Sequence, residues 1–263
     1  MYTKLGSTSK FTVEAEGDGL EYQWYYKSPS SSKFTICSGT KATYSLKMTE
    51  ARSGRQLYCI VTDKYGNSEK TDTVFMRQKL QITSEPKTQY EPLGDKAKFT
   101  VKAEGDGLKY QWYYKSAGSS KYKKCSGAEA TYSLEMTEAR KDRKFYCVIT
   151  DKYGNEEKTK TVTMKMAASI KTEPKSVKTT IGKKATFTVK ALGDDLKYQW
   201  YYKDTDGKKY NKASCTKATY SIELTKAREG RKFYCVVTDK YGNEVKTKTV
   251  SDRKSHTSEL QSR

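Results

Sequence analysis

Six cysteines and one histidine are the side chains with the most obvious potential for metal, redox or nucleophile chemistry. The cysteines fall two to each stretch of about ninety residues, and His256 stands alone near the end of the chain. No Cys-x-x-Cys spacing occurs and no histidine accompanies the cysteines, so no set of zinc ligands can be assembled. No Gly-x-Ser-x-Gly or Gly-rich phosphate loop follows a predicted strand either. We therefore expect no catalytic residues, no metal and no cofactor.

Two interpretations of the cysteines stay open, an intradomain disulfide or a pair of buried thiols. A bridge would close a loop of about twenty residues and contribute about 3 kcal/mol. The geometry opposes a bridge. The two cysteines are expected on strands two positions apart in the sheet, with about 10 Å between them, whereas a disulfide needs Cα atoms about 4.4 to 6.8 Å apart. The candidate pairs are Cys37 with Cys59, Cys125 with Cys147, and Cys215 with Cys235.

The cysteines belong to a unit that the chain repeats three times. The tryptophans at 24, 112 and 200 and the cysteines at 59, 147 and 235 both recur at a spacing of 88 residues. A period of this length is too long for a solenoid repeat and fits a small domain in tandem. We predict domains over residues 1–77, 78–166 and 167–251, followed by a polar disordered tail over 252–263.

Within each unit the apolar residues alternate with polar ones, which predicts half-buried β-strands. In the first copy the segments 11–15, 22–27, 42–48 and 57–62 show this pattern. We expect Asp63 to Asn67 to form a hairpin turn rather than a calcium site, since it contains a lysine and few carboxylates. The fold class is therefore all-β, with Trp24, Trp112 and Trp200 as core anchors.

A first strand precedes the second and third copies but not the first. Leu80 to Ile82 before Pro86 has its counterpart at Ile170 before Pro174, and the first copy has no equivalent. We expect that domain 1 lacks this strand and that the chain is a segment of a longer protein. Because no Gly-rich or Pro-rich spacer separates the copies, we expect a semi-rigid, monomeric array.

The motif order resembles an immunoglobulin-like (Ig-like) β-sandwich, and more narrowly the tandem Ig-like repeats of large surface proteins of Gram-positive anaerobes. The resemblance rests on Tyr22-Gln-Trp-Tyr25, Glu50-Ala-Arg52, Tyr58-Cys-Ile-Val-Thr-Asp63 and Tyr65-Gly-Asn67 with their copies, and covers about residues 1 to 251. It implies an extracellular, non-enzymatic structural or interaction segment at the cell surface or cell wall, with a protein or carbohydrate ligand. The chain departs from antibody-like members at Val13, Val101 and Val189, which stand where those members carry a cysteine. We further expect Glu50 and Arg52 to pair at the corner that they share.

A second functional hypothesis is that the repeats themselves bind a carbohydrate or an anionic polymer. The net charge is +20, nearly all of its excess is lysine, and mean hydropathy is −0.92. Lysine attracts polyanions in general, whereas forked phosphate or guanine contacts favour arginine, so specific nucleic-acid recognition is not expected. The N-terminal residues show no signal-peptide pattern and no run of about eighteen apolar residues indicates a membrane span. The candidate binding face consists of Gln23, Tyr25, Tyr58, Gln111, Tyr113, Tyr146, Gln199, Tyr201 and Tyr234.

Overall fold

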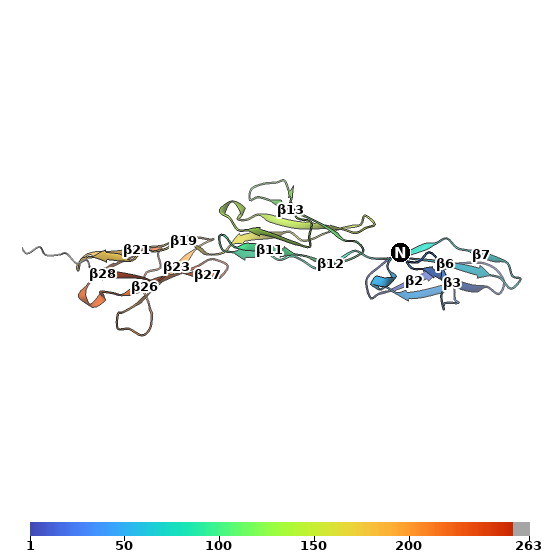
Figure 1. Cartoon of the computed structure of the whole chain (residues 1–263), viewed down its shortest axis with the longest axis horizontal. Coiled ribbons are helices and arrows are strands. Elements are labelled where there is room, and N and C mark those ends of the chain that lie inside the picture. Colours follow the sequence, from blue (N-terminus) through green and yellow to red (C-terminus); the bar gives the residue numbers. More distant parts are fainter. Residues whose placement is uncertain (255–263) are drawn as a thin grey trace, which may run out of the picture.

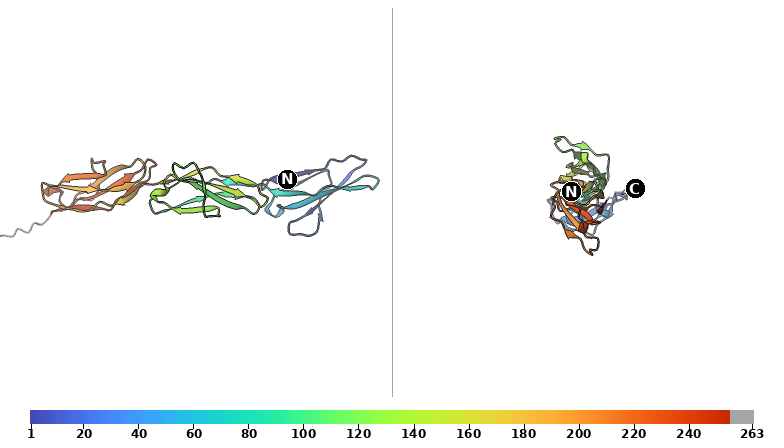
Figure 2. Two further views of the ribbon diagram at one scale, coloured as in Figure 1. Left: turned by 90° about the horizontal axis from the view of Figure 1, so that it is seen from above. Right: turned by 90° about the vertical axis from the view of Figure 1, so that its left-hand side faces the viewer.

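The computed structural model describes residues 1–254, which fold into three β-sandwiches arranged in one extended row (Figures 1 and 2). Domain 1 holds strands β1 to β8, domain 2 holds β9 to β18, and domain 3 holds β19 to β28. The predicted all-β, Ig-like tandem array is confirmed. The N-terminus lies beside the junction between domains 1 and 2 (Figure 2), so the opposite end of domain 1 is an outer tip of the row.

Domain 2 shows the complete sandwich. One layer is a six-stranded sheet that is antiparallel apart from the parallel pair β10 and β18. Its order is β10 (Gln89–Glu91), β18 (Val162–Met166), β16 (Lys144–Thr150), β13 (Lys109–Lys115) and β14 (Lys123–Lys124), with β17 (Glu156–Lys158) also beside β16. The facing layer pairs β11 (Lys96–Thr100) with β15 (Thr131–Glu135), and β9 (Gln81–Ser84) with β12 (Lys102–Glu104). The 3-10 turn η2 (Glu138–Arg140) forms the corner before β16.

Domain 3 repeats this arrangement strand for strand. Its elements are β19 (Ser169–Thr172), β20 (Val177–Thr179), β21 (Lys184–Thr188), β22 (Lys190–Leu192), β23 (Lys197–Lys203), β24 (Asn211–Lys212), β25 (Thr219–Glu223), η3 (Lys226–Arg228), β26 (Lys232–Thr238), β27 (Glu244–Lys246) and β28 (Val250–Lys254). The last strand corrects our boundary for the tail at residue 252, because residues 252–254 pair in parallel with β20 and Asp252 is fully buried. Backbone pairing needs no apolar alternation, so this polar strand gave no sequence signal. Residues 255–263 lie outside the described part of the chain.

Domain 1 is the incomplete copy. It contains β1 (Tyr2–Thr3), β2 (Thr8–Thr12), β3 (Glu21–Lys27), β4 (Thr35–Ile36), β5 (Thr43–Lys47), η1 (Glu50–Arg52), β6 (Arg55–Thr62), β7 (Ser68–Lys70) and β8 (Val74–Gln78). Strand β2 ends at Thr12, whereas we predicted a strand over 11–15. In domains 2 and 3 the equivalent of residues 14–16 is a strand because it pairs with β9 or β19. Among residues 1–254, no strand pairs with residues 14–16.

The tryptophans occupy the three cores. Trp24 is 2 % exposed, and Trp112 and Trp200 are fully buried. Each indole N–H donates to a backbone carbonyl, at 2.9 Å to Lys41, 3.0 Å to Glu129 and 2.8 Å to Lys217. Burying about 200 Å² of indole at about 25 cal/mol per Å² gives about 5 kcal/mol per domain as an upper bound.

The turn prediction is confirmed and the corner ion pair is wrong. Asp63 Oδ1 accepts the backbone N–H groups of Tyr65 and Asn67, both at 2.9 Å, and Gly66 takes a φ of 89°. Hydrogen bonds to the Asp63 carboxylate, above all the one from the Asn67 side-chain amide, lower the pKa of Asp63.

At the corner, Arg52 donates to the Lys47 carbonyl at 2.9 Å instead of pairing with Glu50, and Arg140 and Arg228 do the same in their copies. A short 3-10 turn aims the arginine back along the preceding strand.

Candidate interaction surfaces

The predicted tyrosine pairs meet on the outer face of each large sheet. Tyr25 on β3 lies directly opposite Tyr58 on β6, with ring centroids 5.0 Å apart and planes at 15°. A third ring, Phe34, packs edge-on against Tyr58 at 4.7 Å. Sequence analysis missed this ring, although aromatic residues at 34, 122 and 210 recur at the 88-residue spacing. The same aromatic triplet is formed by Tyr113, Tyr146 and Tyr122 in domain 2 and by Tyr201, Tyr234 and Tyr210 in domain 3.

Lysines of the protein itself cover these rings. The Lys70 ammonium lies 4.1 Å from the centre of the Tyr58 ring, and its equivalents Lys158 and Lys246 lie 4.0 and 3.8 Å from Tyr146 and Tyr234. Strand β7 carries Lys70 on the opposite side of β6 from β3. The central tyrosine therefore sits between its partner ring and an ammonium group, a stabilising cation–π arrangement. A sugar ring could stack on the central tyrosine only by displacing the partner ring or the ammonium group.

The glutamines assigned to the same face are engaged with the backbone. Gln23 Nε2 donates to the carbonyls of Trp24 and Cys37 at 3.0 and 2.9 Å. Gln111 bonds Trp112 and Cys125 in the same way, and Gln199 bonds Trp200 and Ala213. These amides hold the short edge strand against its neighbour, and their N–H donors are already used.

All six cysteines are free thiols, and none of the three candidate bridges is formed. Cys37 donates its backbone N–H to Trp24, and Trp24 lies opposite Cys59 on its other side. Strand β3 therefore separates the two cysteines by two strand spacings, about 9.5 Å, which exceeds the reach of a disulfide. Cys125 and Cys147 flank Trp112 in the same way. In domain 3, Ala213 takes the place of Cys37, and Cys215 lies where domains 1 and 2 have Gly39 and Gly127.

Five of the thiols are protected by burial. Desolvation raises the pKa of Cys147 to about 12 and that of Cys235 to about 11, and it also raises the pKa values of Cys37, Cys59 and Cys125. The thiolate is the reactive form, so these groups should react slowly. Cys215 alone is partly exposed.

We predict that a thiol reagent titrates one cysteine quickly in the native protein and all six after denaturation. Cys215→Ser should remove the fast phase and leave five slow thiols. The measurement is a colorimetric thiol count at mildly alkaline pH, with and without guanidinium. Fewer than six thiols in denaturant, before any reductant is added, would show that a bridge forms.

The two joints between domains use equivalent residues. At the first joint, Tyr2 packs against Tyr153 with centroids 6.0 Å apart, and the Arg77 guanidinium lies 4.4 Å from the Tyr153 ring. Ser53 donates its hydroxyl to Asp106 across the joint. At the second joint the residues 88 positions later take the same places: Tyr90 packs on Tyr241, Lys165 lies over Tyr241, and Lys141 pairs with Asp194.

The second joint carries more charge than the first. The Asp194 side chain is 12 % exposed, and it accepts the Tyr241 hydroxyl at 2.8 Å besides pairing with Lys141. Burial alone would raise the pKa of Asp194, but the Lys141 ammonium, the Tyr241 hydroxyl and Lys240 together hold it below its usual value. Lys171 also pairs with Glu138 of domain 2 at 2.7 Å. The joint therefore combines an aromatic contact with partly buried ion pairs.

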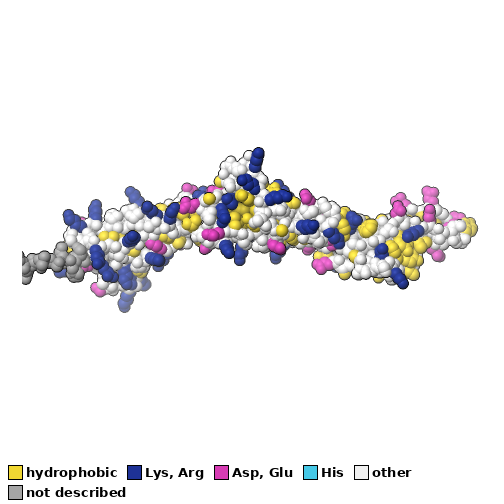
Figure 3. Space-filling model, turned by 45° about the horizontal axis from the view of Figure 1, so that its top comes forward, with side chains coloured by type: hydrophobic (Ala, Val, Ile, Leu, Met, Phe, Trp, Pro, Cys, Tyr) yellow, Lys and Arg dark blue, Asp and Glu magenta, His cyan; other side chains and the backbone are white. Residues whose placement is uncertain are grey.

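Charge is spread along the row. On the face shown in Figure 3, Lys and Arg side chains occur over all three domains, with Asp and Glu between them. Among residues 1–254, no three His, Cys, Asp or Glu side chains are grouped as metal ligands. That part of the chain also contains no helix with the length and apolarity needed to cross a bilayer.

Comparison with known proteins finds only distant structural similarities. No protein-family model and no curated protein matches the chain. Extracellular domains 3–5 of Drosophila OTK are similar at 15 % identity over 97 % of this chain and 94 % of that one, with a TM-score of 0.45. The N-terminal four Ig domains of Dscam1 isoform 6.44 are similar at 12 % identity over 97 % and 71 %, with a TM-score of 0.41. Three N-terminal domains of the outer capsid protein Hoc of bacteriophage RB49 are similar at 12 % identity over 96 % of each chain, with a TM-score of 0.39.

Proposed function

We propose that this chain is a non-enzymatic structural segment of a bacterial cell-surface protein, a stalk that holds other parts at a set distance. The observation that carries the proposal is the joint built twice from equivalent residues. A stalk needs a fixed orientation from one domain to the next. Tyr2 and Asp106 make the contacts at the first joint, and their equivalents Tyr90 and Asp194 make them at the second.

The connections between domains support the same proposal. Only Lys79 and Leu80 separate β8 from β9, and Leu80 is 3 % exposed. Only Ala167 and Ala168 separate β18 from β19, and they are 4 % and 3 % exposed. Connections this short limit how far neighbouring domains can move apart, and the joint contacts then fix their orientation.

The alternative, in which the repeats bind a carbohydrate or anionic polymer, has weaker support. The aromatic triplets are covered by the protein's own lysines, and the neighbouring glutamines are bonded to the backbone. What favours the alternative is the net charge of +20. Such an attraction would be a general electrostatic one, and it would weaken with salt.

Two measurements on the whole chain test the proposal. Small-angle X-ray scattering should give the profile of one elongated particle, unchanged as salt increases. Heparin, polyphosphate and a glycan array should show either no binding or binding that disappears at high salt. A profile that requires averaging over many domain orientations would contradict a stalk. Salt-resistant binding that is lost in the combined variant Tyr58→Ala, Tyr146→Ala, Tyr234→Ala would favour the alternative.

The cell-surface location needs its own test. Antibodies raised against the chain should label intact cells that make the protein, without permeabilisation. Labelling that appears only after the cells are opened would contradict this part of the proposal, and it would leave the stalk geometry to be judged by scattering.

A further inference from the structure

On the outer face of the domain 2 sheet, two lysines lie directly opposite each other. Lys115 on β13 is the cross-strand partner of Lys144 on β16, on the same face as the aromatic triplet because side chains alternate along a strand. Domain 3 repeats this pair with Lys203 and Lys232. Like charges directly opposite on neighbouring strands destabilise a sheet, so the pair contributes nothing to folding.

Two further lysines of domain 2 lie on the same face. Lys124 on β14 is opposite Tyr113, and Lys158 on β17 lies over the Tyr146 ring. Their equivalents in domain 3 are Lys212 and Lys246. We call the four lysines of each domain the lysine patch. Within residues 1–254, no carboxylate forms an ion pair with any of these eight ammonium groups.

The aromatic triplet holds two of the four ammonium groups of each patch in place. In domain 2, the Lys115 ammonium lies 5.1 Å from the centre of the Tyr122 ring, and that of Lys158 lies 4.0 Å from Tyr146. A cation–π contact positions an ammonium group and leaves its charge intact. A side chain that is already ordered loses less freedom when a ligand binds. In domain 3 the same contacts join Lys203 to Tyr210 and Lys246 to Tyr234.

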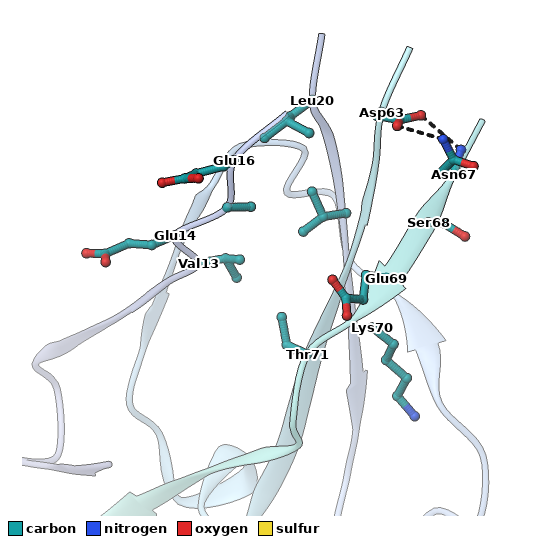
Figure 4. Close-up of a pocket in the computed structure, with 12 residues that line it drawn as sticks. Val13, Glu14, Glu16, Leu20, Asp63, Asn67, Ser68, Glu69, Lys70 and Thr71 are labelled. Carbon is teal, nitrogen blue, oxygen red and sulfur yellow. Dashed lines mark hydrogen bonds between the residues drawn. The ribbon is translucent and has the colours of Figure 1, made fainter. Parts of the chain in front are cut away.

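Domain 1 has lysine at only two of the four positions. Lys27 and Lys70 are present, while Ile36 and Gln56 stand where domains 2 and 3 have the other two lysines. Figure 4 shows Lys70 pointing to the opposite side of β7 from Glu69, away from the pocket, which agrees with its place over the outer face. Ile36 is 61 % exposed. The complete patch is therefore a feature of domains 2 and 3, and domain 1 serves as an internal comparison.

We propose that the lysine patches of domains 2 and 3 each bind a segment of a linear polyanion that carries repeated phosphate or sulfate groups. The patch spans β14, β13, β16 and β17, and neighbouring strands lie about 4.8 Å apart, so it is about 14 Å wide. A single small anion reaches one or two of these lysines, whereas a chain of anions reaches all four. Lysine offers a point charge without the fork of arginine, so phosphate and sulfate are equally suitable. This binding role is independent of the stalk.

Single-stranded nucleic acid fits the patch less well than a polyanion without bases. Proteins that bind single strands stack the bases on exposed aromatic rings. Here Lys158 and Lys246 cover the central rings of the two triplets. A nucleic acid would therefore contribute only its backbone charge, and its bases would find no platform.

Calorimetric titration of the whole chain with short heparin and polyphosphate oligomers at low salt tests the proposal. We expect two equivalent sites per chain and an affinity that falls steeply as salt increases. A quadruple patch variant should bind roughly tenfold or more weakly, and its salt slope should be smaller by about 2, because each patch loses two cations. Its four substitutions are Lys124→Gln, Lys144→Gln, Lys212→Gln and Lys232→Gln. Absence of binding to both polymers, or tighter binding of single-stranded DNA of equal charge, would overturn the proposal.

A charge-matched variant separates the patch from general attraction to a basic protein. It removes four lysines of the same two domains from the facing layer, and it should bind within about twofold of the wild type. Equal losses in the two quadruple variants would refute a localised site. The control substitutions are Lys98→Gln, Lys102→Gln, Lys184→Gln and Lys190→Gln, all at exposed positions.

A gain of binding in domain 1 provides the complementary test. Ile36→Lys with Gln56→Lys completes the patch there and should raise the number of sites per chain from two to three. A stoichiometry that stays at two would contradict the assignment of these positions. Thermal scans should show every variant folded, since the patch substitutions remove opposed charges instead of core contacts. None of these outcomes alters the scattering test of the stalk, so the two proposals fail separately.

Discussion

Replacing Trp112 with alanine should severely destabilise domain 2 and leave domains 1 and 3 unaffected. The side chain is fully buried, packs near Phe99 and Tyr132, and donates its indole N–H to the Glu129 carbonyl. Truncating a buried tryptophan costs about 3 to 5 kcal/mol, and the unpaired carbonyl adds about 1 kcal/mol. A domain of this size has about 4 to 13 kcal/mol of stability in all, so the loss removes between about a third of that stability and all of it.

Calorimetry on the whole chain measures this effect, because one of the unfolding transitions should move to much lower temperature or disappear. Trp112→Phe should give a smaller loss, since it keeps an aromatic ring but cannot donate to Glu129. Tyr122→Ala is the matched control, because it removes an aromatic residue of the same domain from the outer face instead of the core. If Trp112→Ala unfolds at the wild-type temperature, the indole does not hold the core together.

The core could be predicted from the sequence because its signal is local and repeated. A period of two around Trp24, Trp112 and Trp200 determines which side chains face inward, whatever the neighbouring strand is. The turn at Asp63 was equally accessible, since a carboxylate bonding amides two and four residues ahead is a short-range interaction.

The surface contacts depend on pairing between strands that are distant in sequence, and the sequence pattern does not predict that pairing. Lys70 covers Tyr58 because β7 lies beside β6. Gln23 is hydrogen-bonded to the backbone because the Cys37 carbonyl lies within its reach. The polar residues 252–254 pair with β20 through their backbone, so their side chains carry no signal.

The joints follow the same logic, and their equivalence appears only when the contacts are known. Asp106 and Asp194 come after glycine turns that look alike in all three copies, and Asp18 occupies the same position in domain 1. The environments of the three aspartates differ because, in the described structure, only Asp106 and Asp194 contact a preceding domain. The Asp18 side chain is 64 % exposed, against 13 % and 12 % for Asp106 and Asp194.

Replacing Asp194 with alanine should release domain 3 from domain 2 without unfolding either. The variant leaves Lys141 and the Tyr241 hydroxyl without their partner, which should cost the joint about 2 kcal/mol. Residual dipolar couplings report the change, because two rigidly joined domains share one alignment tensor and two loosely joined domains do not. Asp18→Ala is the matched control and should change nothing between domains.

Acid should reproduce this release in the native protein. The pKa of Asp194 is lowered in the folded state, so its contribution is complete above the ordinary value of 3.8 and is lost as the pH falls through the lower, folded value. The tensors of domains 2 and 3 should therefore separate only in strong acid, and Asp194→Ala should show separated tensors at neutral pH already. Equal tensors in the alanine variant at neutral pH would mean that Tyr90, Tyr241 and the Lys171–Glu138 pair hold the joint alone.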